Sequence, residues 1–251
     1  MGYVFDFKDA MMYERWHREP ERRSEAEREF HLMIEMLKPA RGETLLDIGC
    51  GTGIHFEALL ERGVSPTGLD PSPYMLDCCF QRFGPRVNLY RSHAEDLPFD
   101  DNSFNHAVLM TTLEFVDDPR QSIAEACRVA KDRVFVGALN RYAIKSIQRR
   151  VAGMFSESIF NKAQFFGVWE LKRMVLSVAG PVPIAWRTIN QFPTACSGLA
   201  QNLEYSPIVQ RCPFGAFLGV VATLMPRFRT RPLALRYRAK KTSGIVAPNT
   251  S

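Results

Sequence analysis

The stretch that most constrains this chain runs from Leu45 to Gly53 and reads LLDIGCGTG. An apolar run leads into an acidic residue, after which every second residue is glycine, and an amphipathic segment containing Phe56 and Leu59 follows. This order is typical of a buried parallel strand, a tight turn and the start of a helix. Glycine allows backbone angles that side chains resist, and it also lets a ligand come close to the main chain.

The acidic residue of this turn indicates what kind of ligand fits. The dinucleotide fingerprint is G-x-G-x-x-G, whereas here Ile54 stands where that fingerprint has its third glycine. The sequence also has no G-x-x-x-x-G-K-[ST] phosphate loop. Asp47, two residues before the first glycine, would repel a pyrophosphate lying over the turn. It would suit a ligand that carries a cationic amine.

Three further segments extend the pattern. Residues 64–70 predict a short strand that ends in Asp70, and an acid at the end of the second strand is the usual acceptor for a ribose diol. Segments 87–99 and 103–116 follow. With these four segments in order, the chain resembles the class I S-adenosylmethionine-dependent methyltransferases, and more narrowly their type 11 small-molecule subgroup. S-adenosylmethionine carries an ammonium and a sulfonium and no phosphate, in keeping with Asp47.

The resemblance, which is best over residues 43–139, implies an α/β fold. We expect a Rossmann-like, doubly wound seven-stranded sheet that is mostly parallel, with one antiparallel strand near the C-terminal edge. We expect a single methyltransferase domain with an N-terminal helical lid (1–42), a cofactor-binding core (43–139) and a substrate cap with the last strands (140–226). A basic tail (227–251) completes the chain.

Apolar periodicity and turn residues place the elements of this fold. A helical stretch is expected over residues 6–37, with a break at Pro20. Further helices are expected over residues 54–62, 119–129 and 169–178, and one more begins at Pro73. Strands are expected at 44–48, 64–70, 86–91, 105–110, 133–139, 184–189 and 215–223. Segments 140–168 and 190–213 exceed a minimal core. In the resembling enzymes such insertions form a substrate cap, and extra packing is the alternative.

The resemblance also implies a cofactor site. Asp47 and the glycine turn would hold the methionine end, and Asp70 the ribose hydroxyls. The expected cofactor-binding residues are Asp47, Gly49, Cys50, Gly51, Thr52, Gly53, Asp70, Met75, His93, Ala94, Met110 and Thr111. His93 stands where the resembling enzymes commonly have Asp, so the adenine contact falls either to its imidazole or to the backbone of residues 94–95.

The sequence leaves the catalytic residues open. Methyl transfer from a sulfonium needs mainly alignment and exclusion of water, and a general base only if the acceptor must lose a proton. Tyr13 and His17 on the presumed lid, and Glu114 after the fourth strand, are the candidates. For Glu114 a solvated or salt-bridged carboxylate is the expected alternative. The charges between Arg18 and Glu29 predict an exposed, mixed-sign helix face.

The distribution of charge limits the kinds of partner that the protein can bind. The net charge is +5, but the chain from Tyr205 onward has eight basic residues and no acid, which leaves −3 for the rest. The basic tail is either a solvated extension or a contact for anionic membrane lipid, and it lacks the stacking aromatics of a nucleic-acid module.

Six cysteines without C-x-x-C predict reduced thiols and no metal site. The absence of a signal-peptide core predicts a cytoplasmic protein.

Three functions follow as hypotheses. The first is a small-molecule methyltransferase using S-adenosylmethionine, with a quinone-like or lipid-associated acceptor suggested by the Phe-rich segment 140–168 and the basic tail. The second is a non-catalytic relative of the same fold, which the departure at His93 and the missing base leave open. The third is a nicotinamide-dependent oxidoreductase, against which the glycine spacing and Asp47 argue. The sequence predicts no oligomeric state.

Overall fold

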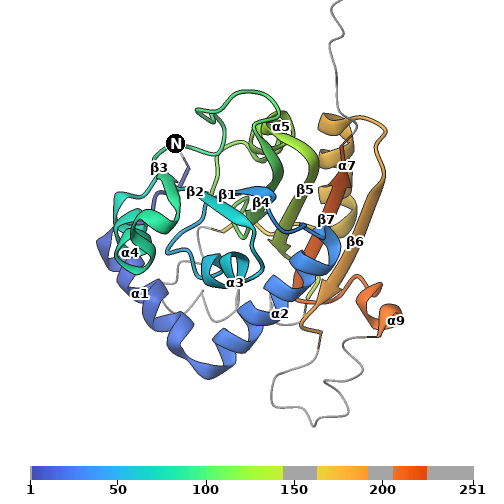
Figure 1. Ribbon diagram of the computed structural model, residues 1–251. Helices are drawn as coiled ribbons and strands as arrows, with labels where there is room; N and C mark the ends of the chain where they lie inside the picture. Colours follow the sequence, from blue (N-terminus) through green and yellow to red (C-terminus); the bar gives the residue numbers. More distant parts are fainter. Residues whose placement is uncertain (1, 144–162, 192–205, 225–251) are drawn as a thin grey trace, which may run out of the picture.

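The computed structural model describes residues 2–143, 163–191 and 206–224. They form a seven-stranded sheet with helices on both faces, in the strand order β3-β2-β1-β4-β5-β7-β6 (Figure 1). All neighbouring pairs from β3 to β5 are parallel, and β7 is antiparallel to both β5 and β6. The doubly wound sheet and its single antiparallel strand near the C-terminal edge are therefore confirmed.

The element bounds agree closely with the sequence pattern. The strands are β1 (Thr44–Ile48), β2 (Ser65–Leu69), β3 (Asn88–Tyr90), β4 (Phe104–Met110), β5 (Ala130–Leu139), β6 (Ile184–Ile189) and β7 (Phe217–Thr223). The helices are α1 (Phe7–Arg18), α2 (Pro20–Leu37), α3 (Phe56–Glu61), α4 (Pro73–Phe83), the 3-10 turn η1 (Gly84–Arg86), α5 (Pro119–Val129), α7 (Val168–Ala179) and α9 (Pro207–Gln210).

The join between α5 and β5 differs from expectation. Strand β5 begins at Ala130, three residues before the expected Arg133, and Ala130 is also the C-terminal cap of α5. Its N–H donates to the carbonyl of Ala126 while its backbone is already extended. No turn residues separate the helix from the strand.

The central strands are buried on both faces, as parallel sheets require. One apolar core lies between the sheet and helices α5 and α7, and it includes Leu46, Ile123 and Leu171. The other lies under α2, α3 and α4, and it includes Leu45 and Phe56. Because β1 is hydrogen-bonded to β2 and β4 in parallel, the carboxyl ends of these three strands meet at one edge of the sheet.

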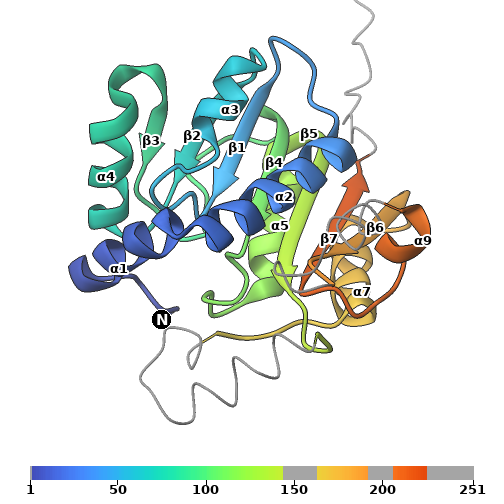
Figure 2. The same cartoon turned by 90° about the horizontal axis from the view of Figure 1, so that it is seen from below.

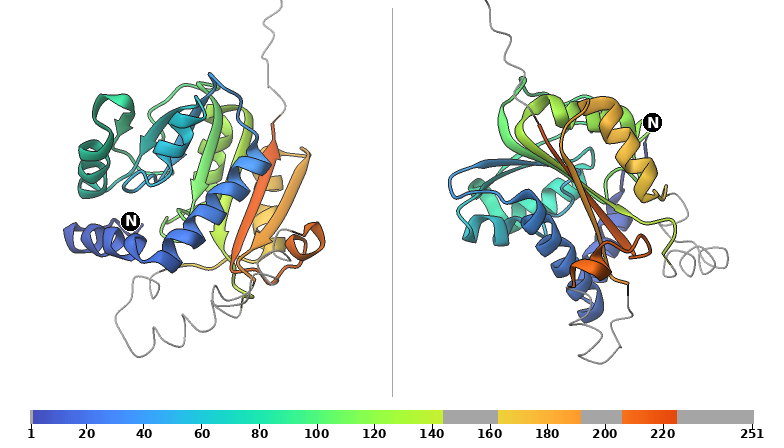
Figure 3. Two further views of the ribbon diagram at one scale, coloured as in Figure 1. Left: turned by 60° about the horizontal axis from the view of Figure 1, so that its bottom comes forward. Right: turned by 90° about the vertical axis from the view of Figure 1, so that its right-hand side faces the viewer.

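The N-terminal helices approach that same edge. Helix α2 packs against β5, β6 and β7, whereas α1 packs against α4 and passes below the tips of β1 and β2 (Figure 2; Figure 3, left). Asp6 and Asp9 form a capping box that starts α1. The expected break is confirmed, because Glu19 alone separates the two helices and Pro20 opens the second.

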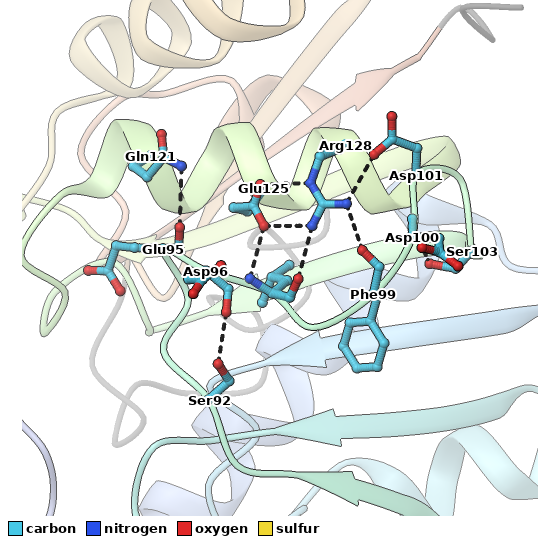
Figure 4. A network of polar contacts seen from close by, with 11 residues as sticks. Ser92, Glu95, Asp96, Phe99, Asp100, Asp101, Ser103, Gln121, Glu125 and Arg128 are labelled. Atoms are coloured by element: carbon cyan, nitrogen blue, oxygen red, sulfur yellow. Dashed lines mark hydrogen bonds and ion pairs between the residues drawn. The ribbon is translucent and has the colours of Figure 1, made fainter.

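The loop between β3 and β4 is held by one arginine of α5 (Figure 4). Arg128 donates to the carbonyls of Phe99 at 2.6 Å and Leu97 at 3.0 Å, and it forms ion pairs with Asp101 and Glu125. Glu125 in turn accepts the N–H of Leu97 at 2.9 Å. These contacts fix the loop against α5, and the same loop carries the expected adenine contacts.

Several expectations fall wholly or partly outside the described residues. They are the basic tail, Cys196, Phe155, Phe160 and most of the two cap segments. Of the part that the structure describes, no helix combines the length and apolar character needed to cross a membrane. The cysteines described, Cys50, Cys78, Cys79, Cys127 and Cys212, are all free thiols.

Candidate functional site

A cavity of about 440 Å³ opens at the carboxyl ends of β1, β2 and β4. Its floor is the glycine turn, and α1 and α2 supply the opposite wall. It brings together all but two of the residues expected to bind a cofactor, namely Asp47, Gly49, Cys50, Gly51, Asp70, Met75, His93, Ala94, Met110 and Thr111. Tyr13 and His17 of the expected lid also line it. The exceptions are Thr52 and Gly53, which do not line it.

The glycines of the turn have different roles, although all three have positive φ. A Cβ on Gly49 would meet the Thr112 side chain at 2.5 Å, and one on Gly53 would meet the sulfur of Cys79 at 2.6 Å. These two positions serve close packing within the protein. A Cβ on Gly51 would have Tyr13 Cε1 as its nearest neighbour, at 3.9 Å. The backbone at Gly51 is therefore the part of the turn that a ligand can approach.

Asp47 is a buried carboxylate that forms no ion pair with a basic residue in the described part of the chain. It ends β1 with 7% of its surface exposed, and its Oδ1 has no hydrogen-bond partner among the described residues. Burial, followed by the negative charge of Asp70, raises its pKa to about 7. A buried carboxylate without a partner is unfavourable, and a cation brought beside it restores the lost solvation.

Asp70 ties the ends of two strands together. One of its carboxylate oxygens accepts the N–H of Gly51 at 3.0 Å, and the other accepts the N–H of Ser72 at 2.9 Å. Burial raises its pKa to about 6, against the opposing effect of these two N–H groups. Ser72 also caps α4 by accepting the N–H of Met75. The same residues thus place a carboxylate and the Met75 side chain side by side in the cavity.

Helix α1 closes the cavity with aromatic side chains. The rings of Tyr13 and His17 meet edge to face with centroids 4.3 Å apart, and Trp16 meets His17 at 4.8 Å. Burial lowers the pKa of His17 to about 4, so the ring is neutral near pH 7, and its Nε2 has no partner among the described residues. Glu14 fastens α1 to Arg82 of α4 at 2.9 Å.

The expectation for Glu114 is wrong. This carboxylate is neither solvated nor paired with a described basic residue; it is 1% exposed and accepts the N–H of Leu139 at 2.6 Å. Burial raises its pKa to about 8. It does not line the cavity, and it joins the end of β4 to the end of β5. This placement removes it as a candidate base.

Two acids of α2 were missed by the sequence pattern. Glu25 and Glu29, expected on an exposed face, both line the cavity, and Glu25 is only 6% exposed. They lie four residues apart and therefore on one side of the helix. Their spacing was visible in the sequence, but which side of α2 faces the cavity is set by its packing on β5, β6 and β7.

Two other expectations are confirmed. His106 is structural, because it lies at the amino-terminal part of β4 and its Nε2 is 2.9 Å from the Glu43 carboxylate. Cys78 and Cys79 face different surroundings, since Cys79 is buried and Cys78 is half-buried. Among the residues that the structure describes, no cluster of ligands suits a metal ion.

Comparison with known proteins gives a consistent result. A family model, Methyltransf_11, described as a methyltransferase domain, matches residues 46–136. An uncharacterized methyltransferase of Mycobacterium bovis is 37% identical over 98 residues, which are 39% of this chain and 40% of the relative. The demethylmenaquinone methyltransferase of Tropheryma whipplei is 30% identical over 135 residues, 49% of this chain and 56% of the relative. The chain thus spans about half or less of these curated relatives.

Likeness to a solved structure extends further along the chain. The crystal structure of an S-adenosylmethionine-dependent methyltransferase from Thermotoga maritima, described as a possible histamine N-methyltransferase, superposes with a TM-score of 0.69. The two proteins are 26% identical, and the match covers 87% of this chain and 97% of that one.

Proposed function

The chain belongs to the class I S-adenosylmethionine-dependent methyltransferases, and from this premise we propose that it transfers a methyl group from S-adenosylmethionine to a small-molecule acceptor. The observation that carries the proposal is the pairing of two features: the buried Asp47, whose Oδ1 has no hydrogen-bond partner among the described residues, and the open backbone at Gly51. A ligand that brings an ammonium group to this point satisfies both features.

The residues present fit this cofactor along its length. Asp47 would hold the ammonium of the methionine part. Asp70 would accept the ribose hydroxyls, because each of its oxygens has one backbone donor and can accept another hydrogen bond. Met75 and Ala94 are both buried, at 3% and 5% exposed, and offer apolar contacts to a base. His93 lies beside them on the cavity wall. Bound there, S-adenosylmethionine supplies an activated methyl group.

The rest of the cavity is suited to positioning and to exclusion of water. Tyr13, Trp16 and His17 close it from α1, and Met110 and Thr111 line it at the end of β4. Alignment of the reacting groups in such a site accounts for several kcal/mol of the barrier, roughly 7–11 in model reactions. Both remaining candidate bases, His17 and Tyr13, line the cavity. The pKa of Tyr13 is raised by burial and by Asp47, so its hydroxyl stays protonated and can donate a hydrogen bond. The neutral ring of His17 is the one of the two that can accept a proton near pH 7.

A quinone-like acceptor is the first candidate class. Its support is the name of the Tropheryma whipplei relative together with the aromatic residues of the cavity wall, Tyr3, Phe5, Tyr13, Trp16 and Phe115. The Thermotoga maritima structure, described as a possible histamine N-methyltransferase, supports an amine instead. Labelled S-adenosylmethionine with a quinol and an amine in separate reactions distinguishes the two.

Calorimetric titration with S-adenosylhomocysteine tests the proposal. We expect binding by the wild-type chain and a loss of at least about tenfold in Asp47→Asn, because the neutral amide cannot pair with the ammonium. An intact, folded chain that binds neither S-adenosylmethionine nor S-adenosylhomocysteine would falsify the proposal. Binding without turnover on any acceptor would support the non-catalytic alternative.

A further inference from the structure

The side of α1 that faces away from the cavity is both apolar and basic. Its large apolar side chains are well exposed, at 62% for Phe7, 43% for Met11 and 41% for Met12. Positions 7, 11, 15 and 18 follow one another at steps of four and three residues, which places them along one side of a helix. We call the exposed residues of α1 its outer face: Phe7, Lys8, Met11, Met12, Arg15 and Arg18.

The acids of α1 lie off this outer face. Asp9 is only 8% exposed and accepts a hydrogen bond from the hydroxyl of Tyr3 at 2.5 Å. Glu14 is half-buried and pairs with Arg82 of α4 at 2.9 Å. Asp6 is exposed, but it precedes the helix and caps it by accepting the N–H of Asp9. Within residues 7–18 the outer face therefore carries three positive charges and no negative charge.

The apolar part of the outer face continues onto α4. The rings of Phe7 and Tyr74 meet edge to face with centroids 5.8 Å apart, and Tyr74 is itself 44% exposed. Helices α1 and α4 lie side by side along this contact (Figure 2). The exposed apolar area is therefore shared by two helices, which hold it in place together.

The outer face is also continuous with the cavity. Met12 of the outer face and Val4, just before the helix, are exposed to solvent and also line the cavity. Tyr13 and His17, on the other side of α1, line the cavity from within. A single helix thus borders the candidate site on one side and presents exposed apolar and basic residues on the other.

We propose that the outer face of α1 docks on an anionic lipid bilayer. A helix that lies on a bilayer places its apolar side chains at the boundary of headgroups and acyl chains, while its basic residues meet the anionic headgroups. An acidic protein surface would match the bases but not the exposed apolar residues between them, whereas such a bilayer matches both. This surface is distinct from the basic tail, which lies outside the described residues.

Docking through α1 would have a consequence for catalysis, and this consequence rests on the proposed methyl transfer. Because Val4 and Met12 border both the outer face and the cavity, an apolar acceptor dissolved in lipid could pass along their side chains to the cavity. Such an acceptor would not have to cross water. The docking itself does not depend on the reaction and can be measured without it.

The test measures binding of the full chain to vesicles by flotation. One set of vesicles is phosphatidylcholine alone, and the other is equal parts phosphatidylcholine and phosphatidylglycerol. We expect at least about tenfold tighter binding to the anionic vesicles, because each basic residue near such a surface strengthens binding by about fivefold. This preference should weaken as sodium chloride is added, since salt screens charges at the surface.

Two variants of the outer face test its two components. Removing the bases in Lys8→Gln/Arg15→Gln/Arg18→Gln should weaken binding to the anionic vesicles by at least about tenfold. Removing apolar area in Phe7→Ser/Met11→Ser should also weaken binding by about tenfold. All five side chains are exposed and none lines the cavity, so both variants should fold and keep their affinity for S-adenosylhomocysteine.

Matched controls remove the same kinds of side chain elsewhere. Arg120→Gln/Lys131→Gln/Arg173→Gln takes three exposed bases from α5, β5 and α7. Leu176→Ser/Phe214→Ser takes two exposed apolar residues that lie outside α1 and α4. We expect both controls to bind the anionic vesicles as the wild type does. Losses as large in the controls as in the outer-face variants would contradict the proposal, because any reduction of charge or apolar area would then suffice.

The remaining outcomes keep the two proposals apart. A wild-type chain that binds no vesicle overturns the docking proposal and leaves an acidic protein as the partner of this face. Equal binding to both kinds of vesicle also overturns it. Unchanged binding in both outer-face variants assigns the contact to another part of the chain, such as residues 227–251. Failure of the wild type to bind S-adenosylhomocysteine contradicts the methyltransferase proposal alone, because flotation does not depend on the cofactor.

Discussion

The backbone N–H of Gly51 donates to the carboxylate of Asp70 across 3.0 Å, so the turn after β1 is bonded to the end of β2. This bond fixes the position of Asp70 relative to the backbone of Gly51, which is the part of the turn that a ligand can approach. It also explains why Asp70 can be ionised while buried, since Gly51 and Ser72 both donate to it.

Asp70→Asn should weaken both the fold and ligand binding. The amide can accept one of the two backbone N–H groups and leaves the other facing an NH₂ group, which costs about 1–3 kcal/mol. We expect a corresponding loss in the free energy of unfolding measured with urea, and binding of S-adenosylhomocysteine weaker by about tenfold or more. Asp77→Asn, at an exposed position of α4, is the control and should change neither quantity.

Cofactor affinity should rise with pH around neutrality. The pKa of Asp47 is raised to about 7 in the folded chain, so the carboxylate that pairs with an ammonium is only partly formed at pH 6. We expect calorimetric affinity for S-adenosylhomocysteine to increase from pH 6 to pH 8. The increase should be smaller in Asp47→Asn; an equal pH dependence in the variant would contradict the role given to Asp47.

The contribution of the buried carboxyl groups to stability without ligand should decrease as pH rises. A carboxyl whose pKa is higher in the folded chain than in the unfolded chain binds more protons when folded, so stability falls as pH rises between the two values. Burial raises the pKa values of Asp47, Asp70 and Glu114 to about 7, 6 and 8. The lowered pKa values of the buried His17 and His55 act in the opposite direction, so the test compares two chains. We expect the free energy of unfolding of Asp47→Asn, relative to that of the wild type, to increase from pH 4 to pH 8. An equal pH dependence in the two chains would refute the assignment.

Glycine substitutions in the turn should separate binding from stability. Alanine at residue 51 has room around its Cβ, so its cost is the positive φ, about 1–2 kcal/mol. Alanine at residue 53 carries the same strain and a clash with the Cys79 sulfur. We expect Gly51→Ala to fold and to lose cofactor affinity, and Gly53→Ala to lose more stability. Thermal unfolding and calorimetry of the two variants, side by side, measure both effects.

Glu114 offers a test of its revised role. Because its pKa is raised to about 8, the side chain is largely protonated at pH 7, and Glu114→Gln should be nearly neutral there. Glu114→Ala removes the acceptor of the Leu139 N–H and should cost about 1–3 kcal/mol. Urea unfolding at pH 7 compares the variants. Equal losses in both would show that the carboxylate is needed in its ionised form.

The sequence predicted those parts of the site that strand ends determine. Asp47 and Asp70 follow apolar runs, and parallel strands bring such ends to one edge, so their meeting could be expected from order alone. The positions of Glu25, Glu29 and Glu114 could not. Whether a helical acid is exposed depends on which face the neighbouring strands cover. Glu114 is buried, and it accepts a hydrogen bond from the N–H of Leu139, which lies 25 positions away in the sequence. Such placements depend on tertiary packing, which a local pattern does not report.

The join at Ala130, where α5 becomes β5 without a turn, has a further consequence. Arg128, two residues earlier, fastens the loop that bears His93 and Ala94. Two residues of chain therefore join the rigid sheet to Arg128, which holds the loop proposed to contact the adenine. A wall that is already ordered loses little conformational entropy when a ligand settles against it, and more of the contact energy is kept as affinity.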